Sequence, residues 1–407
     1  SFKLINLYLK TKYAIITLPI LAASIVNLSN FTHGGSAEQF CLPLLTISLY
    51  HLFDYFENSY PYPISNKIVL INGVIAGCIL WIKFSLLGFW FGWIAAIFIG
   101  MFAKQEVVRA IKAMFVFLLG ILIATLPWLI YFGSNHAIFD LLNAYFMFNI
   151  NNYSRANSLL SIMIFTIIGI LFHRPENPFF FGLMYFGLIN FIIYRKLSDN
   201  IYLKLGLLVC FLSLGLSVYG GGRRYVYYFL IFSPFVFLGF IAVLNIFVEY
   251  VGELRSKKLF VAILLFALLV AFTYTLFFQH NVYMLDLNKE DLVQFKYAAI
   301  INQTKNPSLL NYGGLDHGFY TTTGIVPSIR FFHHPNIVYS RYPIILDEQN
   351  RYIKEQIVDY VVFQVPTDYS GDFKIPLLDE NYHLIGREKQ KNEDNEFYYF
   401  LYKKNPD

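Results

Sequence analysis

The strongest constraint on the fold is the run of apolar segments that occupies residues 1–278 of this 407-residue chain. Hydrophobic residues make up 57% of the chain and charged residues only 14%, far from the globular average. A bilayer core takes about 20 apolar residues per helix, and on that measure the chain has about ten candidate segments. They are centred near residues 20, 47, 74, 93, 122, 165, 187, 210, 237 and 268. We therefore expect a mainly α, polytopic transmembrane helix bundle whose first partner is a lipid bilayer.

Charge and cysteine usage exclude several other classes. The formal net charge of +5 is modest, and because the Lys and Arg residues are scattered among loops we expect no nucleic-acid partner. The three cysteines lie inside apolar segments without metal-type spacing, which favours small core residues over a disulfide framework or a zinc site. The phosphate-cradling, zincin and nucleophile-elbow motifs G-x-x-x-x-G-K-[ST], H-E-x-x-H and G-x-S-x-G do not occur.

The basic loops predict how the bundle is oriented. Lys and Arg favour the cytoplasmic side, and they gather at residues 104–112, 195–196 and 255–258. With these loops inside, the loops around Glu38 and Arg223 lie outside, and so do residues 279–407. Between residues 112 and 195 three clear segments occur where an even number is required. Residues 137–150, which are apolar but too short to span, are a candidate re-entrant or interfacial helix.

Residues 279–407 change to a mixed polar and apolar pattern, which predicts a small soluble α/β or α+β domain outside the membrane. Helices are expected at residues 288–303 and 347–356, a strand at residues 308–312, and a buried strand at residues 357–365. Residues 397–403 alternate as an edge strand does. His333 and His334, together with Asp316 and His317, were weighed as metal ligands, but without a third ligand at suitable spacing they are interpreted as solvated loop residues.

The first polar loop in the apolar region reads Gly-Gly-Ser-Ala-Glu-Gln at residues 34–39. Gly34 and Gly35 allow a tight turn and a close approach to a ligand, and Glu38 follows where an apolar helix begins. A general base or a metal ligand would suit this place. The alternative interpretation is a first-turn glutamate that only complements the helix dipole.

The second polar loop reads Gly-Gly-Gly-Arg-Arg-Tyr at residues 220–225. Gly221 and Gly222 are expected to expose backbone N–H groups, and the guanidinium groups of Arg223 and Arg224 match phosphate oxygens in pairs. The loop therefore predicts a receptor for a lipid-linked phosphate. Snorkelling to lipid headgroups beside an aromatic belt is the alternative.

Three further residues are weaker candidates. Lys83 interrupts a long apolar stretch and either adds to phosphate binding or snorkels. Asn151 and Tyr153 offer sugar-like hydrogen-bond partners and an aromatic ring, and Tyr225 offers the same on the arginine loop, although polar clusters also mark plain interfacial loops.

These stretches resemble a family. Residues 34–40 are similar to a Gly-Gly-x-x-Glu-Glu-Phe-like loop, and residues 222–229 are similar to a Gly-Arg-x-Tyr-x-His-Tyr-Phe pattern. Both of these patterns are typical of bacterial multi-spanning glycosyltransferases of the GT-C class, the broad group of family 39 protein mannosyltransferases and the aminoarabinose transferase, which the chain therefore resembles. In residues 279–407, Gly318-Phe319-Tyr320 and Asp359-Tyr360-Val361-Val362 look like that group's external C-terminal domain. Tyr227 stands where the pattern has His, and Gln39 stands where a second acid often occurs.

The resemblance implies an enzyme that transfers a sugar from a polyprenyl-phosphate donor to a cell-envelope acceptor at the plasma membrane. It implies that Arg223 and Arg224 bind the donor phosphate and that Glu38 positions the acceptor or assists a base. In such an enzyme we expect Lys83 to add to phosphate binding, and Tyr225, Asn151 and Tyr153 to contact the sugar or acceptor. Such enzymes usually carry a catalytic acid in their first external loop, which is expected upstream of residue 1. A divalent metal ion stays open as a cofactor. A flippase or transporter of lipid-linked saccharides, and a non-catalytic envelope-assembly protein, are the alternatives.

Overall fold

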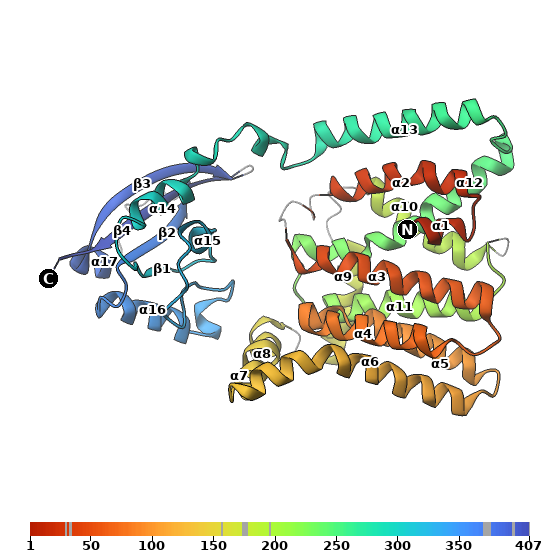
Figure 1. Cartoon of the computed structure of the whole chain (residues 1–407), viewed down its shortest axis with the longest axis horizontal. Helices are drawn as coiled ribbons and strands as arrows, with labels where there is room; N and C mark the ends of the chain where they lie inside the picture. Colours follow the sequence, from red (N-terminus) through yellow and green to blue (C-terminus); the bar gives the residue numbers. More distant parts are fainter. Residues whose placement is uncertain are drawn as a thin grey trace. The chain divides into compact units, whose positions relative to one another are not determined.

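The computed structural model describes residues 1–28, 31, 35–155, 158–172, 178–194, 197–368, 376–392 and 395–406. The chain is mainly helical and divides into two compact units, Ser1–His280 and Asn281–Asp407 (Figure 1).

The first unit is a helical bundle, and a helix lies at each of the ten expected apolar segments. Its helices are α1 (Phe2–Asn6), α2 (Thr11–Val26), α3 (Ala37–Asp54), α4 (Asn66–Lys83), α5 (Gly88–Phe102), α6 (Val107–Ser134), α7 (Ile138–Leu142), α8 (Phe148–Tyr153), α9 (Leu159–Phe172), α10 (Pro178–Ile193), α11 (Ile201–Tyr219), α12 (Phe237–Val251) and α13 (Lys257–Phe278). Short 3-10 or π-helical stretches cover Tyr55–Ser59, Phe84–Leu86, Asn143–Met147 and Val226–Val236.

Within the described ranges, five helical stretches are long and apolar enough to cross a membrane. They are Asn66–Leu86, Val107–Ser134, Ile201–Tyr219, Val226–Val251 and Lys257–Phe278. Helices α2, α5, α9 and α10 are apolar but shorter. Helix α3 carries Glu38, Gln39, His51 and Asp54, which lower its mean hydropathy. The unit is therefore a membrane-type bundle with five helices that match a full crossing, while the count of ten spans stays an expectation.

Small residues bring some of these helices very close together. A Cβ atom added to Gly73 of α4 would meet the backbone of Phe117 and Gly120 on α6. A Cβ atom added to Gly187 of α10 would meet the backbone of Leu238 and Gly239 on α12. Close backbone approach at small residues is typical of helices that pack inside a bilayer, where dispersion contacts replace the hydrophobic effect.

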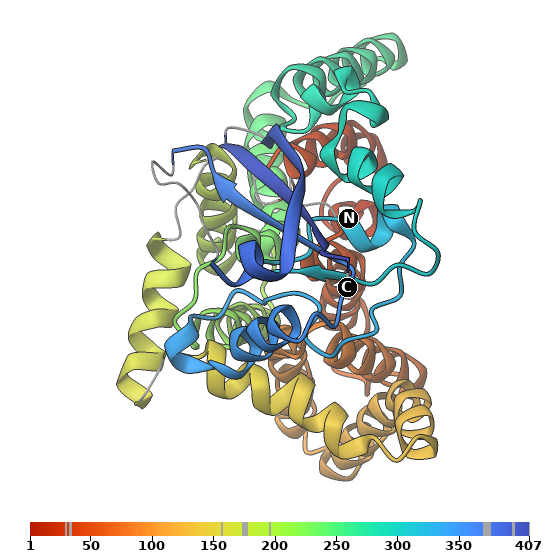
Figure 2. The same ribbon diagram turned by 90° about the vertical axis from the view of Figure 1, so that its left-hand side faces the viewer.

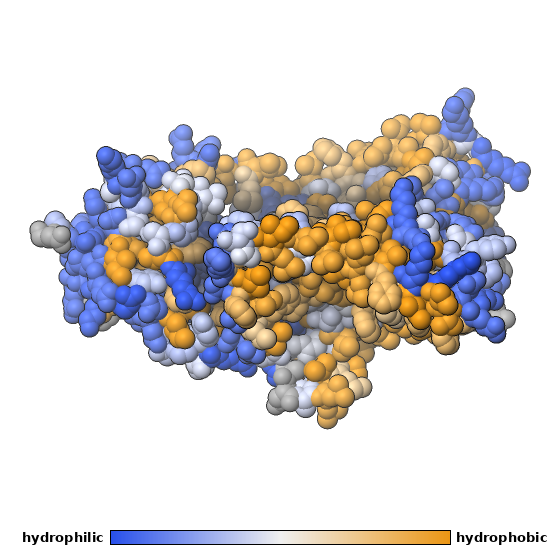
Figure 3. Space-filling view, turned by 60° about the horizontal axis from the view of Figure 1, so that its bottom comes forward, coloured by the Kyte–Doolittle hydropathy of each residue, from blue (hydrophilic) through white to orange (hydrophobic). Residues whose placement is uncertain are grey.

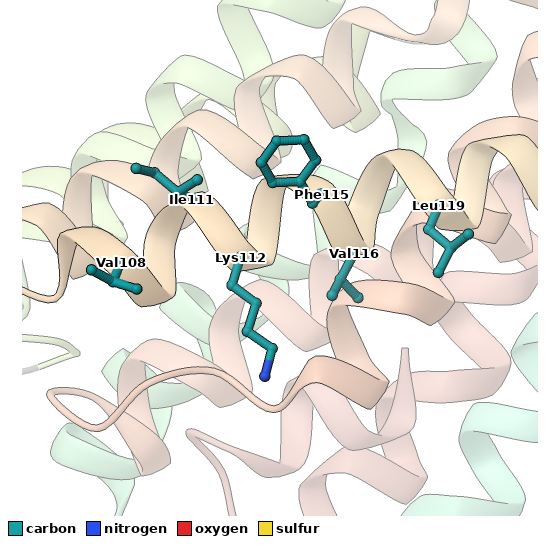
Figure 4. A pocket seen from close by; sticks show the side chains of 6 residues that line it. All are labelled: Val108, Ile111, Lys112, Phe115, Val116 and Leu119. Atoms are coloured by element: carbon teal, nitrogen blue, oxygen red, sulfur yellow. The ribbon is translucent and has the colours of Figure 1, made fainter.

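The outer face of the bundle is apolar. Figure 3 shows a broad area of hydrophobic residues on the face of the first unit that is in view. Figure 4 shows one shallow groove on this face, along α6, where Val108, Ile111, Phe115 and Leu119 accompany Lys112. Only 17% of the apolar window of α6 is buried inside the protein, which fits a helix that lipid covers.

The bundle has two distinct ends, which are marked by different polar contacts. At one end, called the basic end, Tyr8 donates to Glu57 (2.8 Å) and Lys10 pairs with Glu253 (2.5 Å). Asn200 donates to the Phe56 carbonyl there, at 2.7 Å. At the other end, called the Glu38 end, Asn27 at the end of α2 donates to Thr275 near the end of α13 (3.2 Å). The chain therefore leaves the first unit at the Glu38 end.

Residues 138–153, which overlap the expected re-entrant or interfacial helix, form the short helices α7 and α8 with a π-helical turn between them. The Tyr145 hydroxyl donates to the Leu80 carbonyl of α4 at 2.8 Å, so this stretch packs at the Glu38 end. Arg195 and Lys196, which form one of the three basic loops used to predict the orientation, lie outside the described residues.

The second unit is built on a four-stranded sheet of order β1-β2-β4-β3. The strands are β1 (Leu309–Asn311), β2 (Tyr360–Pro366), β3 (Tyr382–Asn392) and β4 (Asn395–Lys404). Strand β1 is parallel to β2, and the other pairs are antiparallel. The strands expected at residues 308–312 and 357–365 are confirmed as β1 and β2. The expectation of an edge strand at residues 397–403 was wrong, because β3 pairs along the whole free side of β4.

Helices cover both faces of this sheet (Figures 1 and 2). Helices α14 (Val293–Ile301) and α15 (Phe319–Thr323) pack on one face, against Tyr360, Val362, Tyr399 and Leu401. Helices α16 (Ile344–Lys354) and α17 (Pro376–Asn381) pack on the other, against Val361, Phe363, Phe400 and Tyr402. The two expected helices correspond to α14 and α16. Because Phe319 and Tyr320 of the Gly318-Phe319-Tyr320 stretch are buried in the first cluster, that stretch is part of the core.

Candidate functional site

The loop before Glu38 is shaped by a glycine and a helix cap. Gly35 has φ +76°, in the left-handed region that favours glycine. Ser36 is the N-cap of α3, and its side chain accepts from the Gln39 N–H at 3.4 Å. Gln39 in turn accepts from the Gly35 N–H at 2.7 Å and donates to the Phe31 carbonyl at 2.9 Å. Gln39, which stands where the resembling loop has a second acid, is thus occupied by hydrogen bonds that hold this turn and the start of α3. Gly34 lies outside the described residues.

Glu38 is buried, and its partner is Lys83. The Glu38 side chain is only 1% exposed, in the first turn of α3. The Lys83 ammonium, at the end of α4 and 20% exposed, donates to Glu38 Oε1. The second carboxylate oxygen, Oε2, is buried and has no hydrogen-bond partner among the residues that the structure describes. Glu38 is therefore more than a surface glutamate that complements a helix dipole.

Aromatic rings complete the surroundings of this ion pair. Lys83 Nζ lies 4.2 Å from the centre of the Tyr228 ring and 5.0 Å from that of Tyr227. The Tyr225 ring stacks on Tyr227 at 5.6 Å with an interplanar angle of 1°. The Tyr225 hydroxyl is buried without a hydrogen-bond partner in the described part of the chain. The ion pair therefore joins the glutamate loop to the tyrosines that follow the arginine loop.

The arginine loop is tied to the end of α8. Arg223 Nε donates to the Tyr153 carbonyl at 2.9 Å, and the Arg155 N–H donates to the Gly221 carbonyl at 2.8 Å. These contacts hold one face of the Arg223 guanidinium and leave its terminal nitrogens for another partner.

The expected cradle of glycine N–H groups is largely wrong. The Gly220 N–H donates to the Leu216 carbonyl and the Gly222 N–H to the Tyr219 carbonyl, at 2.9 and 2.8 Å. Both groups are therefore occupied by the turn that ends α11. Gly222 has φ +78°, and a Cβ atom there would lie 2.7 Å from the Phe165 ring and 3.2 Å from Arg155 Cβ. The glycine is needed for the shape of the turn.

The structure brings some predicted residues together and leaves others apart. Glu38, Lys83 and Tyr225 share one cluster through Tyr227 and Tyr228, and Arg223 and Tyr153 adjoin it. Arg224 and Asn151 are exposed, and neither has a hydrogen bond or ion pair within the described ranges. No hydrogen bond or ion pair joins Glu38 to either arginine in those ranges. The cation that pairs with Glu38 is Lys83, which was expected either to bind phosphate or to snorkel and not to form this ion pair.

Cys41, Tyr219 and Tyr228 were not singled out from the sequence. Cys41 is fully buried, and it lies on α3 one turn after Glu38. The Tyr219 ring lies beside that of Tyr228, with ring centres 6.4 Å apart, and Tyr228 in turn lies under Lys83 Nζ. The spacing of three residues between Glu38 and Cys41 on a helix was the available signal for the cysteine.

The cluster supports proton transfer and anion binding more directly than metal binding. A search of the described residues finds no group of three or more His, Cys, Asp or Glu side chains placed to hold a metal ion. Glu38 Oε2 can accept a proton from a hydroxyl group, and the lysine and arginine groups can stabilise negative charge beside it.

Comparisons with protein-family models, with curated protein sequences and with solved structures find no match to this chain.

Proposed function

We propose that this chain is an integral membrane glycosyltransferase. It transfers a sugar from a polyprenyl-phosphate donor to a cell-envelope acceptor, which is a glycan, a lipid or a protein. The observation that carries the proposal is the buried Glu38 carboxylate at one end of a membrane-type bundle, with one oxygen held by Lys83 and the other without a partner among the described residues. The arginine loop beside it supports a phosphate-bearing donor.

In the proposed mechanism Glu38 Oε2 accepts the proton of the acceptor hydroxyl as that oxygen attacks the anomeric carbon with inversion. The bond between the anomeric carbon and the phosphate oxygen breaks, and its electron pair leaves on the lipid phosphate. Arg223 and Arg224 stabilise the charge that develops on this phosphate, while Lys83 holds the Glu38 carboxylate in place. Tyr225 and Tyr153 supply hydroxyl and aromatic contacts to the sugar.

The proposal also gives the bundle a direction. The basic end, with Lys10, Lys104 and Arg255, faces the cytoplasm, because Lys and Arg favour that side. The Glu38 end then faces the outside, where lipid-linked sugars take the place of nucleotide sugars. Since the chain leaves the first unit at the Glu38 end, the second unit belongs on the outer side too.

The test is transfer of radiolabelled sugar from polyprenyl-phosphate donors by membranes that contain the full chain. Arg223→Ala is compared with Arg109→Ala, which removes an exposed arginine at the basic end that pairs only with Glu106 at 3.1 Å among described residues. We expect Arg223→Ala to reduce transfer at least tenfold and Arg109→Ala to leave it within twofold. Equal rates for the two variants would remove the arginine loop from the mechanism.

A lipid-linked saccharide flippase is the second candidate, and the buried ion pair itself favours it. Charged residues inside membrane bundles often mark transport pathways and proton relays. Movement of labelled lipid-linked sugar between the leaflets of vesicles, without a new glycosidic bond, would select this candidate over the transferase.

A further inference from the structure

The second unit contains a cleft of about 550 Å³ at the carboxyl ends of the two parallel strands. Strand β1 ends at Asn311, and the Tyr312 N–H donates to the Val362 carbonyl at 2.8 Å. Strand β2 continues to Pro366, so from Gln364 onward no residue of β1 lies beside it. Crevices at the carboxyl ends of parallel strands are common ligand sites, and this volume is within the roughly 300–1,000 Å³ typical of small-molecule pockets.

The chemistry of the lining is polar but uncharged. Its polar side chains are Asn311, His317, His334, Asn336 and Gln364, and its rings are Tyr312, Phe363 and Phe397. The described residues that line the cleft include no Lys, Arg, Asp or Glu. Burial lowers the pKa of His317 and of His334, so both imidazoles are neutral at pH 7 and each offers one donor and one acceptor.

One residue that lines the cleft has a side-chain acceptor without a hydrogen-bond partner in the described part of the chain. The Oε1 atom of Gln364 is buried, and within the described chain no donor reaches it. Buried polar atoms without partners are uncommon in folded proteins, and a bound ligand is one way of satisfying them.

The loops around the cleft are held in place before any ligand binds. Gly313 donates to Gln349 Oε1 (3.0 Å), and Asn311 donates to the Leu315 carbonyl (2.7 Å). The His334 N–H donates to the Gly314 carbonyl at 2.8 Å, which links the two loops that form the walls. Binding then orders little of the protein, which favours affinity.

Two other ligand classes fit less well. An anion such as phosphate would meet no cation in the lining. An extended peptide would need a free strand edge, but the unpaired edge of β2 begins only at Gln364 and ends at Pro366, which has no N–H group. A neutral molecule with many hydroxyl groups matches paired donors and acceptors beside aromatic rings.

We propose that this cleft is a binding site for a neutral saccharide, with Gln364, His317, His334 and Asn336 contacting its hydroxyl groups. The site is separate from the Glu38 cluster, and it does not depend on the chain being a glycosyltransferase.

The test is saturation-transfer NMR on the full chain in lipid nanodiscs, with empty nanodiscs as the blank. The probes are neutral hexasaccharides of glucose, mannose, galactose and N-acetylglucosamine, together with inorganic phosphate and a Thr-Val hexapeptide. Gln364→Leu removes the unpartnered acceptor, and Asn336→Ala removes an exposed side chain at the rim. Gln303→Leu is the matched control, since Gln303 is exposed and is not among the lining residues.

We expect at least one neutral hexasaccharide to bind, and Gln364→Leu and Asn336→Ala each to weaken it about tenfold while Gln303→Leu leaves it within twofold. A tenfold loss is what one hydrogen bond of about 1.4 kcal/mol supplies. Absence of saccharide binding by the folded chain would overturn the proposal. Binding unchanged in both cleft variants, or binding of only phosphate or the peptide, would overturn it as well.

Discussion

Glu38 shows how strongly a single carboxylate depends on its partner. A carboxylate that is 1% exposed is stable as an anion only where a cation or several donors compensate for the lost water, and here Lys83 does so through one oxygen. A purely structural ion pair and a catalytic carboxylate would both show this burial and this pairing with a cation. Stability and activity must therefore be measured on the same variants.

For stability, we expect Glu38→Gln and Lys83→Met each to lower the free energy of unfolding by about 3 kcal/mol, because each leaves one buried charge alone. The double variant removes both charges and should recover most of this loss. Thermal unfolding in detergent, followed by the fluorescence of Trp81, Trp90, Trp93 and Trp128, reports the first unit. Additive losses in the double variant would mean that the two residues are not coupled.

Gly222 and Gly35 provide a matched pair for the loop backbone. Both have φ near +77°, but a Cβ atom at Gly35 meets nothing within 4 Å, whereas at Gly222 it meets Phe165 and Arg155. Gly35→Ala should cost about 1 kcal/mol from backbone strain alone. Gly222→Ala should cost clearly more, and should weaken donor binding by displacing Arg223. Equal unfolding temperatures for the two variants would contradict the close packing at Gly222.

At this scale the sequence predicted local features and missed distant ones. The turn at Gly35 and the place of Glu38 in the first turn of α3 follow from neighbouring residues, and both are confirmed. The pairing with Lys83, 45 residues away, depends on how α3 and α4 pack, and no local pattern reports it. The expected glycine N–H cradle was wrong at Gly220 and Gly222, because the turn that ends α11 uses those two N–H groups.

At the scale of elements, the sheet of the second unit depends on one side-chain clamp. The Asp359 carboxylate accepts from the Ser308 N–H (2.9 Å) and hydroxyl (2.7 Å), which fixes the start of β1 against β2. Asp359→Ala should lower the stability of this unit by about 1–3 kcal/mol, because the Ser308 donors lose their acceptor. Hydrogen exchange of peptides from β1 and β2 measures it, and unchanged protection would contradict the clamp.

The positions of the helices and strands were largely predictable from the sequence, but which elements pack or pair with one another was not. Helical periodicity was sufficient to predict α14 and α16, and short apolar runs were sufficient to predict β1 and β2, which are buried along almost their whole length. Strand β3 has mixed polar residues, and its pairing with β4 is a non-local contact that turned an expected edge into the centre of the sheet. Likewise, apolar composition predicted where the membrane-type helices lie, but length and hydropathy distinguish five of them from the shorter ones.

For the whole molecule, stability should depend on pH through the histidines of the second unit. Burial lowers the pKa of His317, His333 and His334, although the Asp316 charge raises the first two in part. Below the unfolded pKa of about 6.5 the unfolded chain takes up protons that the folded chain resists, so stability falls as the pH decreases from 7 toward 5. Hydrogen exchange of β2 and β4, corrected for intrinsic rates, should be faster at pH 5.5 than at pH 7.5. Equal protection at both values would contradict this.

The central claim is that the Glu38 cluster transfers sugar, and the most direct measurement compares Glu38→Gln with Asp140→Asn for transfer of radiolabelled sugar from a polyprenyl-phosphate donor. Asp140 is exposed on α7 and is a matched acid-to-amide control in the same unit. We predict that Glu38→Gln lowers the rate by about 10²–10⁴-fold, the usual contribution of a general base. Asp140→Asn should stay near the wild-type rate, and the Glu38→Gln, Lys83→Met double variant should stay inactive although its stability returns. Transfer that persists in folded Glu38→Gln, or that returns with stability in the double variant, would contradict the account.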